Sequence, residues 1–227
     1  MFVGHYSAAL AAKAVEPRAP LWTLVAAAQL IDIGWAALVM GGIEKVRIDE
    51  SLPGSALDLH YMPFTHSLPA VAVWSLAAIV LSRWLLKLSW RPAIVIGLVV
   101  FSHWLLDFLV HREDLLLWPG GDKVGLGWWN YPVPEQALEI GLLGLGGMAL
   151  LWSRGRNGGG WFAPMSFFAG LVALQILVMF MPAGEDTFAL GMNALIVYVV
   201  LSAVAWVIDR GPPAAAPAKR GMAKRRR

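Results

Sequence analysis

The chain contains no cysteine, so disulfide bonds, cysteine-based zinc sites and thiol nucleophiles are all excluded. Histidine is absent from residues 112–227, although five histidines lie before that point. Lysine and arginine are absent from three long apolar stretches that contain acidic side chains. Those acids are Asp32, Asp107, Glu135 and Glu139. Because an unpaired acid inside a bilayer is costly, each of them needs a partner or a function.

Charge is scarce along the whole chain, and long apolar runs take its place. Charged residues make up 15% of the 227 residues and hydrophobic residues 58%, a balance typical of a multi-pass membrane protein. Six segments approach the ~20 residues that cross ~30 Å of hydrocarbon. They cover about 20–41, 67–88, 93–111, 134–153, 162–182 and 188–208. We therefore expect an all-α membrane bundle of six transmembrane helices, preceded by a short helix over about 2–15.

The two ends of the chain differ from this apolar body. The N-terminal segment lacks a basic stretch before its apolar run, so we expect it to be retained rather than cleaved as a signal peptide. Because Lys13 is its only charge before Glu16, we expect it to insert into the bundle rather than lie flat on the surface. Residues 1–210 are expected to form one membrane domain. Residues 211–227 combine a Pro/Ala linker with a basic end, which predicts a disordered tail that contacts anionic lipid rather than nucleic acid.

Loop charges predict the orientation in the membrane. Loops 83–92 and 154–161 carry only basic charges and loop 183–187 only acidic ones, while loops 42–66 and 112–133 have an excess of acids. The sign alternates at each crossing, and the positive-inside rule then places the basic loops and the C-terminus in the cytoplasm. A multi-pass membrane protein with a cytoplasmic C-terminus is expected.

Two local patterns predict how helices pack. The break at Trp90-Arg91-Pro92 predicts that 67–88 and 93–111 are antiparallel neighbours joined by a short turn. Gly141, Gly144 and Gly147 are expected to allow close approach of another helix, as small residues do in membranes.

The most informative polar pattern lies in the segment FSHWLLDFLVH. His103, Asp107 and His111 are four residues apart, which keeps all three on one face of a helix. The predicted orientation puts this face in the outer half of the bundle, together with the other intramembrane acids and with His60 and His66. A cluster of imidazoles and carboxylates without a basic residue is typical of a site for a divalent cation.

Three short motifs, FTHSL at 64–68, SHWLLD at 102–107 and LLWP at 116–119, together with Gly4-His5, resemble the YdjM family of bacterial inner-membrane proteins. The resemblance covers about residues 1–120. That family is described as membrane-bound, metal-dependent hydrolases, so the resemblance implies a metal centre and hydrolytic chemistry. The family's Pro-Asp-x-Asp motif is reduced here to the single acid Asp32, and the segment from His60 to His66 is one residue longer and lacks the family's Arg.

These observations lead to a hydrolase hypothesis. His66, His103 and Asp107 would bind a divalent ion, with zinc favoured, and His5 or Asp32 would complete the shell. His60 and His111 are further candidate ligands. A metal-activated water would be the nucleophile and Glu139 or Asp32 the general base. The position near the outer interface suits an amphiphilic substrate, such as a lipid-like ester or phosphoester, and no Gly-x-Ser-x-Gly elbow offers an alternative nucleophile.

Two other functions remain open at this point. Intramembrane His and Asp residues also serve transporters and proton relays, although the sequence has no internal repeat of the kind many transporters carry. A non-catalytic membrane protein with a structural metal is the third possibility. A closed four-ligand shell would favour the structural role, and an open coordination position would favour an enzyme.

Overall fold

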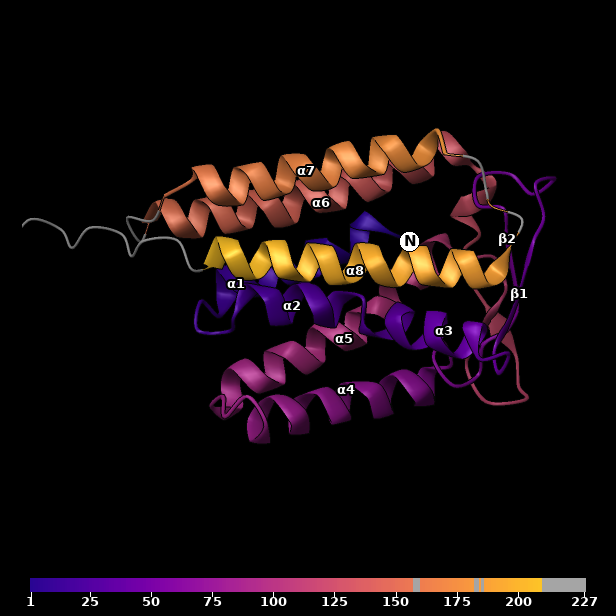
Figure 1. Ribbon diagram of the computed structural model, residues 1–227, viewed down its shortest axis with the longest axis horizontal. Coiled ribbons are helices and arrows are strands. Elements are labelled where there is room, and N and C mark those ends of the chain that lie inside the picture. Colours follow the sequence, from indigo (N-terminus) through magenta and orange to yellow (C-terminus); the bar gives the residue numbers. More distant parts are fainter. Residues whose placement is uncertain (157–159, 182–183, 185, 210–227) are drawn as a thin grey trace, which may run out of the picture.

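The computed structural model describes residues 1–156, 160–181, 184 and 186–209, and the described chain is a helical bundle (Figure 1). The α-helices are α1 Tyr6–Val15, α2 Leu21–Ala28, α3 Leu30–Met40, α4 Leu68–Trp84, α5 Trp90–Val110, α6 Pro132–Arg156, α7 Phe162–Met179 and α8 Thr187–Asp209. Short 3₁₀ turns, η1 Val3–His5 and η2 Trp128–Asn130, precede α1 and α6. The all-α class is therefore confirmed. The tail expected to be disordered, 211–227, lies outside the described residues.

Within the described residues, four helices are long and apolar enough to cross a membrane, namely α5, α6, α7 and α8. The pair α2 and α3 forms a fifth candidate if it is taken as one bent span. Helix α4 is apolar but shorter, with 17 residues. Large apolar side chains cover the outer surfaces of α7 and α8, as expected where lipid is the solvent.

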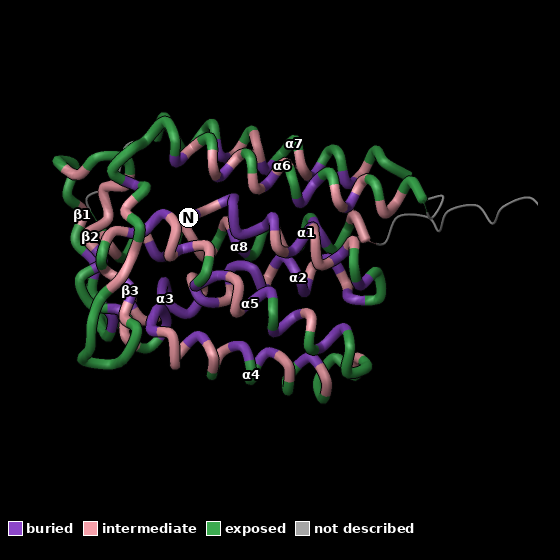
Figure 2. The backbone as a smooth tube through the Cα atoms, turned by 180° about the vertical axis from the view of Figure 1, so that it is seen from behind, coloured by how far each residue is buried: buried purple, intermediate pink, exposed green. Residues whose placement is uncertain are grey.

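The N-terminal segment lies inside the bundle, as its sparse charge predicts. Helix α1 packs against α6, α2 and α5, and Val3, Tyr6 and Ala9 are fully buried. Figure 2 shows α1 and α2 largely buried while α7 is largely exposed. The segment that begins the chain is thus part of the core, flanked by the α4–α5 pair on one side and the α6–α7 pair on the other (Figure 1).

Helices α4 and α5 form the predicted antiparallel hairpin. Ser67 begins α4 by accepting a hydrogen bond from the Ala70 amide, and Pro69 lies in the first turn, where its missing N–H costs nothing. The chain reverses over residues 85–89, and α5 begins at Trp90 with Pro92 in its first turn. The two helices then pack along their length, which confirms the predicted pairing.

The segment predicted as one helix over 20–41 is wrong in one respect, because it is broken. Helices α2 and α3 meet at 51°, and Gln29 between them has a non-helical backbone (φ −113°, ψ 11°). The Ala28 carbonyl lies 2.8 Å from His103 Nδ1. A side chain inserted into the helical ladder is a recognised cause of such a kink. The break therefore belongs to the site and not to the local sequence, which contains no proline or glycine there.

Two short hairpins cover one end of the bundle, where the loops 42–66 and 112–133 were expected (Figure 1). Strand β1 Lys45–Ile48 pairs with β2 Leu57–Tyr61, and β3 Leu115–Leu116 pairs with β4 Lys123–Val124, both antiparallel. Arg112 braces this cap because its guanidinium donates to the carbonyls of Pro53, Ser55 and Leu57.

The glycine positions that allow close packing differ from those expected. A Cβ on Gly141 or Gly144 would meet nothing within 4 Å, whereas one on Gly147 would lie 2.7 Å from the Phe168 ring. Among the glycines within the described helices, the closest backbone approach is at Gly146, where a Cβ would lie 2.5 Å from the Ser7 carbonyl oxygen. Gly146 therefore lets α1 contact α6 backbone to backbone, and the expectation for Gly141 and Gly144 is wrong.

Candidate metal centre

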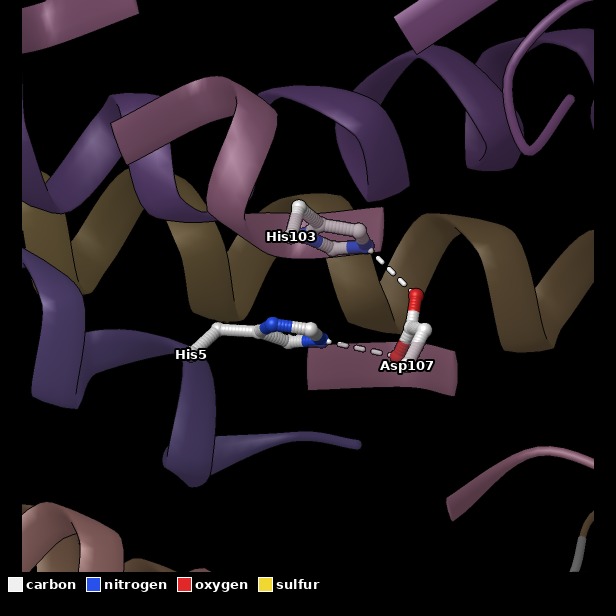
Figure 3. Close-up of side chains that lie close together, drawn as sticks. All are labelled: His5, His103 and Asp107. Carbon is white, nitrogen blue, oxygen red and sulfur yellow. Dashed lines mark ion pairs between the residues drawn. The ribbon is translucent and has the colours of Figure 1, made fainter. Parts of the chain in front are cut away.

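Four imidazoles surround the carboxylate of Asp107, which is buried with 2% of its side chain exposed. Oδ1 lies 3.1 Å from His5 Nε2 and 3.3 Å from His111 Nε2. Oδ2 lies 3.1 Å from His103 Nε2 and 3.6 Å from His66 Nε2. Figure 3 shows His5 and His103 directed at the two oxygens of Asp107. The carboxylate thus forms the centre of a group of imidazole nitrogens.

Asp32 adds a second carboxylate at the edge of this group. Its Oδ1 lies 3.4 Å from His66 Nε2 and 3.5 Å from His103 Nε2, and its Oδ2 accepts a hydrogen bond from the Tyr198 hydroxyl at 3.2 Å. Its side chain is 16% exposed, against 3% or less for the four histidines. Asp32 is therefore the most accessible member of the cluster.

Four parts of the chain supply these side chains. His103 and Asp107 lie one turn apart on α5, as their spacing predicts. His5 ends η1, His66 immediately precedes the Ser67 cap of α4, and Asp32 lies in the first turn of α3 after the break. Two subsets bring ligand atoms within 4.8 Å of one another, and they share one histidine. The subsets are His5, His103 and Asp107, and Asp32, His66 and His103.

Three of the imidazoles are anchored through Nδ1. The partners are the Thr65 hydroxyl for His66, the Ala28 carbonyl for His103 and the Asp114 carboxylate for His111, each at 2.8 Å. A carbonyl or a carboxylate can only accept, so Nδ1 carries the proton in His103 and His111. In the neutral form of these rings, the Nε2 lone pair points toward the carboxylates. His5 has no such anchor, and its ring instead stacks on His103 at 3.7 Å between centroids.

Polar atoms in this cluster lack ordinary hydrogen bonds. Within the part of the chain that the structure describes, His103 Nε2 and both ring nitrogens of His5 are buried without a hydrogen-bond partner. The Met1 amino group, in contrast, donates a hydrogen bond to Asp107 Oδ1 at 3.0 Å. Where a ring is neutral, its lone pair and a carboxylate oxygen repel one another unless a proton or a metal cation lies between them, since burial removes the water that would screen them.

Glu139, a candidate general base, holds the turn that carries His5. The backbone amides of Phe2 and Gly4 donate to its carboxylate at 3.0 Å, so both of its oxygens already accept hydrogen bonds. One turn earlier on α6, buried Glu135 accepts a hydrogen bond from the Gln136 amide. The structure therefore brings Glu139 next to the cluster as a support for η1.

His60 does not join the buried cluster. Its side chain is exposed on β2, and its Nδ1 lies 3.2 Å from the Asp58 carbonyl. It lines an outer cavity of about 270 Å³ together with Asp114, Arg112 and Lys123. Its role as a ligand remains a prediction that this placement does not support.

The family model described as YdjM inner membrane protein matches residues 1–208. The chain belongs to this family. The match extends well past the predicted limit near residue 120 and includes α6 and α7 as well as most of α8. No curated protein and no solved structure matches the chain. YdjM membership therefore establishes a membrane protein, in agreement with the apolar helices, while the chemistry has to be argued from the site.

Several residues that support the site in this YdjM protein carried no clear signal in the sequence. Thr65 adjoins His66, and Asp114 lies three residues after His111, so local spacing could have suggested both. Glu44, which accepts a hydrogen bond from the Thr65 hydroxyl, lies 21 residues before it. Tyr198 reaches Asp32 from α8, a separation of 166 residues. Contacts at such separations depend on packing and leave no periodic pattern.

Proposed function

We propose that this protein is a membrane-bound, metal-dependent hydrolase that acts on a lipid-like or amphiphilic ester or phosphoester. His66, His103 and Asp107 would bind a divalent ion, with His5 and Asp32 as the nearest further donors and His111 at the edge. The donor set of imidazole nitrogens and carboxylate oxygens suits zinc. When bound, such an ion would supply Lewis acidity and make a water nucleophilic near neutral pH.

The spacing of the donor atoms is the observation that carries this proposal. The nitrogen–oxygen distances around Asp107 and Asp32 run from 3.1 to 3.6 Å. Four ligands about 2.0–2.1 Å from a tetrahedral zinc ion lie about 3.3 Å from one another. The buried His103 Nε2 without a hydrogen-bond partner fits the same interpretation. Outside support through Nδ1 is also typical of histidines that bind metals.

The residues around this centre suggest separate roles. Asp32 is the favoured general base because it is the most accessible carboxylate and the Tyr198 hydroxyl orients its second oxygen. Glu139 remains the other candidate, although its oxygens accept amide hydrogen bonds from Phe2 and Gly4. A site enclosed by apolar helices suits a substrate that is itself partly dissolved in lipid.

The finer topology also belongs to this proposal. We infer six crossings, formed by the four long helices, the bent α2–α3 pair and α4. The basic loops and the C-terminus would face the cytoplasm, with the two hairpins outside. The polar cluster would then lie in the outer half of the membrane.

One observation favours transport as a second candidate. Many transporters bind their ions where a transmembrane helix is broken, and Asp32 lies just after the 51° break between α2 and α3. A metal- or proton-coupled transporter would use the same residues without hydrolysis. A structural metal remains a third reading, and a fully closed ligand shell would favour it.

Metal analysis of the purified full chain tests the central claim. We expect the protein to contain zinc or another divalent ion in a defined ratio. His103→Ala should lose the metal because His103 belongs to both ligand subsets. His60→Ala is the matched histidine variant, since the exposed His60 ring lies outside the buried group, and it should keep the metal. Hydrolysis of a lipid-like ester should stop after chelation and in His103→Ala.

The outcomes separate the candidates. Turnover that survives complete metal removal would eliminate the metal-dependent mechanism. A metal-loaded protein that is inert toward ester, phosphoester and amide amphiphiles would favour the transport or structural interpretation. Circular dichroism of each variant shows whether its helices remain folded.

A further inference from the structure

A buried carboxylate lies one hydroxyl group away from His66. Glu44 follows α3 and precedes β1, and its side chain accepts hydrogen bonds from the amides of Phe64 and Thr65 at 2.8 and 3.0 Å. The Thr65 hydroxyl donates to its other oxygen at 2.6 Å. Glu44 is 1% exposed. All three groups donate, so the Glu44 carboxylate is the acceptor in each of these hydrogen bonds.

In the part of the chain that the structure describes, no cation forms an ion pair with the Glu44 carboxylate. Other acids in the described ranges pair within 4.0 Å with lysine, arginine or histidine side chains or with the N-terminal amine, but Glu44 does not. A buried charge is costly unless a hydrogen-bonded partner or a metal compensates it. The Thr65 hydroxyl connects the Glu44 carboxylate to the imidazole of His66, which is the closest candidate metal ligand along these hydrogen bonds.

The hydrogen bonds along this route decide where the His66 proton lies. Thr65 has a single hydroxyl proton, and it donates this proton in the hydrogen bond to the Glu44 carboxylate, which can only accept. The Thr65 oxygen must therefore accept from His66, whose Nδ1 lies 2.8 Å away. The Nε2 lone pair of His66 is then left to face Asp32 and Asp107, at 3.4 and 3.6 Å. The indole N–H of Trp104 also donates to the His66 carbonyl at 3.1 Å, which holds the backbone in place.

We propose that Glu44 and Thr65 are positioning residues that lock His66 in its Nδ1–H form and strengthen its binding to a divalent cation. This inference rests on the metal centre proposed above. A cation bound to the His66 imidazole would supply the positive charge that is missing beside the Glu44 carboxylate. The Nδ1 partners of the other two anchored histidines differ from this one. His103 bonds a neutral backbone carbonyl, and His111 bonds Asp114, whose side chain is 12% exposed. Only the hydrogen-bonded chain from His66 through Thr65 ends on a carboxylate that is almost fully buried, that of Glu44.

The first test measures the proton on His66 in the metal-free full chain. Protein labelled with ¹⁵N-histidine is expected to give the Nδ1–H pattern for His66 in long-range nitrogen–proton spectra, with His66→Gln used for assignment. Thr65→Val removes the acceptor and keeps the shape of the side chain, so it should abolish that single-tautomer signal. A merely structural threonine would leave the signal unchanged. An Nε2–H pattern in the folded wild-type protein would overturn the proposal without any variant.

The second test measures zinc affinity by competition with a chelating dye. Thr65→Val and Glu44→Gln should bind Zn²⁺ roughly 10- to 100-fold more weakly, the usual loss when a support of a histidine ligand is removed. Thr65→Ser restores the hydroxyl and should bind close to wild type. The matched control is Thr23→Val, because the Thr23 hydroxyl is also buried but donates only to the Pro20 carbonyl. It should leave the affinity unchanged.

The pattern of results distinguishes this inference from the metal centre itself. If the wild-type protein binds zinc and Thr65→Val and Glu44→Gln bind it equally well, the support is refuted and the centre stands. If the wild-type protein binds no divalent ion, the centre fails and this inference falls with it. Should Thr65→Val not fold, the wild-type spectrum and the Glu44→Gln and Thr65→Ser affinities still decide.

Discussion

Asp107 shows why single residues matter so much in this site. Its two oxygens meet four imidazole nitrogens, and both the aspartate and the histidines are removed from solvent. In such surroundings polar contacts are stronger than in water, and groups left without partners are correspondingly costly. A residue beside this site can therefore act in catalysis or only support the structure, and Glu139 is the clearest case where the two roles need separate tests.

Glu139→Gln tests whether this residue supports η1 or acts as a base. The Glu139 carboxylate accepts from the Phe2 and Gly4 amides, so losing part of that support should displace His5. We expect weaker zinc binding and a lower melting temperature, since an unsatisfied buried donor costs about 1–3 kcal/mol. Zinc titration and thermal unfolding measure both effects. Glu113→Gln, on the exposed surface, controls for the loss of a carboxylate. Unchanged zinc affinity with lost turnover would instead indicate a general base.

At the scale of elements, the buried N-terminal segment depends on close contact between α1 and α6. A Cβ at Gly146 would lie 2.5 Å from the Ser7 carbonyl oxygen and 2.8 Å from its Cα. Backbone atoms cannot move aside as the end of a flexible side chain can. The position of His5, which ends η1 just before α1, therefore depends on a glycine on another helix.

Gly146→Ala should push α1 away from α6. Overpacking of this kind costs about 1–3 kcal/mol, so a lower melting temperature and weaker zinc binding are expected. Gly144→Ala is the matched control on the same helix, because a Cβ there meets nothing within 4 Å. Equal melting temperatures for the two variants would contradict the close approach of α1 to α6.

For the whole molecule, the open question is which end of the bundle faces the cytoplasm. The two hairpins lie together at one end, on the side reached by the loops with acidic excess, and the basic loops lie on the other (Figure 1). The positive-inside rule predicts the hairpins outside. The absence of native cysteine makes this topology easy to measure.

Asp122→Cys and Arg156→Cys place one thiol at each end of the bundle in a chain that has no other. A membrane-impermeant maleimide added to spheroplasts should label the cysteine at position 122. The cysteine at position 156 should react only after the membrane is opened. Labelling of position 156 alone in intact spheroplasts would reverse the proposed orientation, and with it the location of the site in the outer half.

Much of this protein follows from its sequence alone. The apolar segments determine a membrane bundle, because a chain in lipid must satisfy its backbone polar groups within helices. The four-residue spacing of His103 and Asp107 determines that they share a face of α5, since helical periodicity is a local property, whereas His111 caps the end of that helix with an extended backbone. The α4–α5 hairpin follows in the same way from Pro92, which lies in the first turn of α5. These features are encoded in continuous local stretches of the sequence.

Only the tertiary structure decided how the rest of the site is assembled. The kink at Gln29, the support of η1 by Glu139 and the route from Glu44 to His66 join residues 21 to 137 positions apart. Each depends on a buried hydrogen bond between elements that packing has brought together, and a hydrogen bond of that kind leaves no periodic trace in either partner's sequence. The same packing separated His60 from the other histidines, because β2 carries it into the exposed cap while His66 enters the bundle ahead of α4.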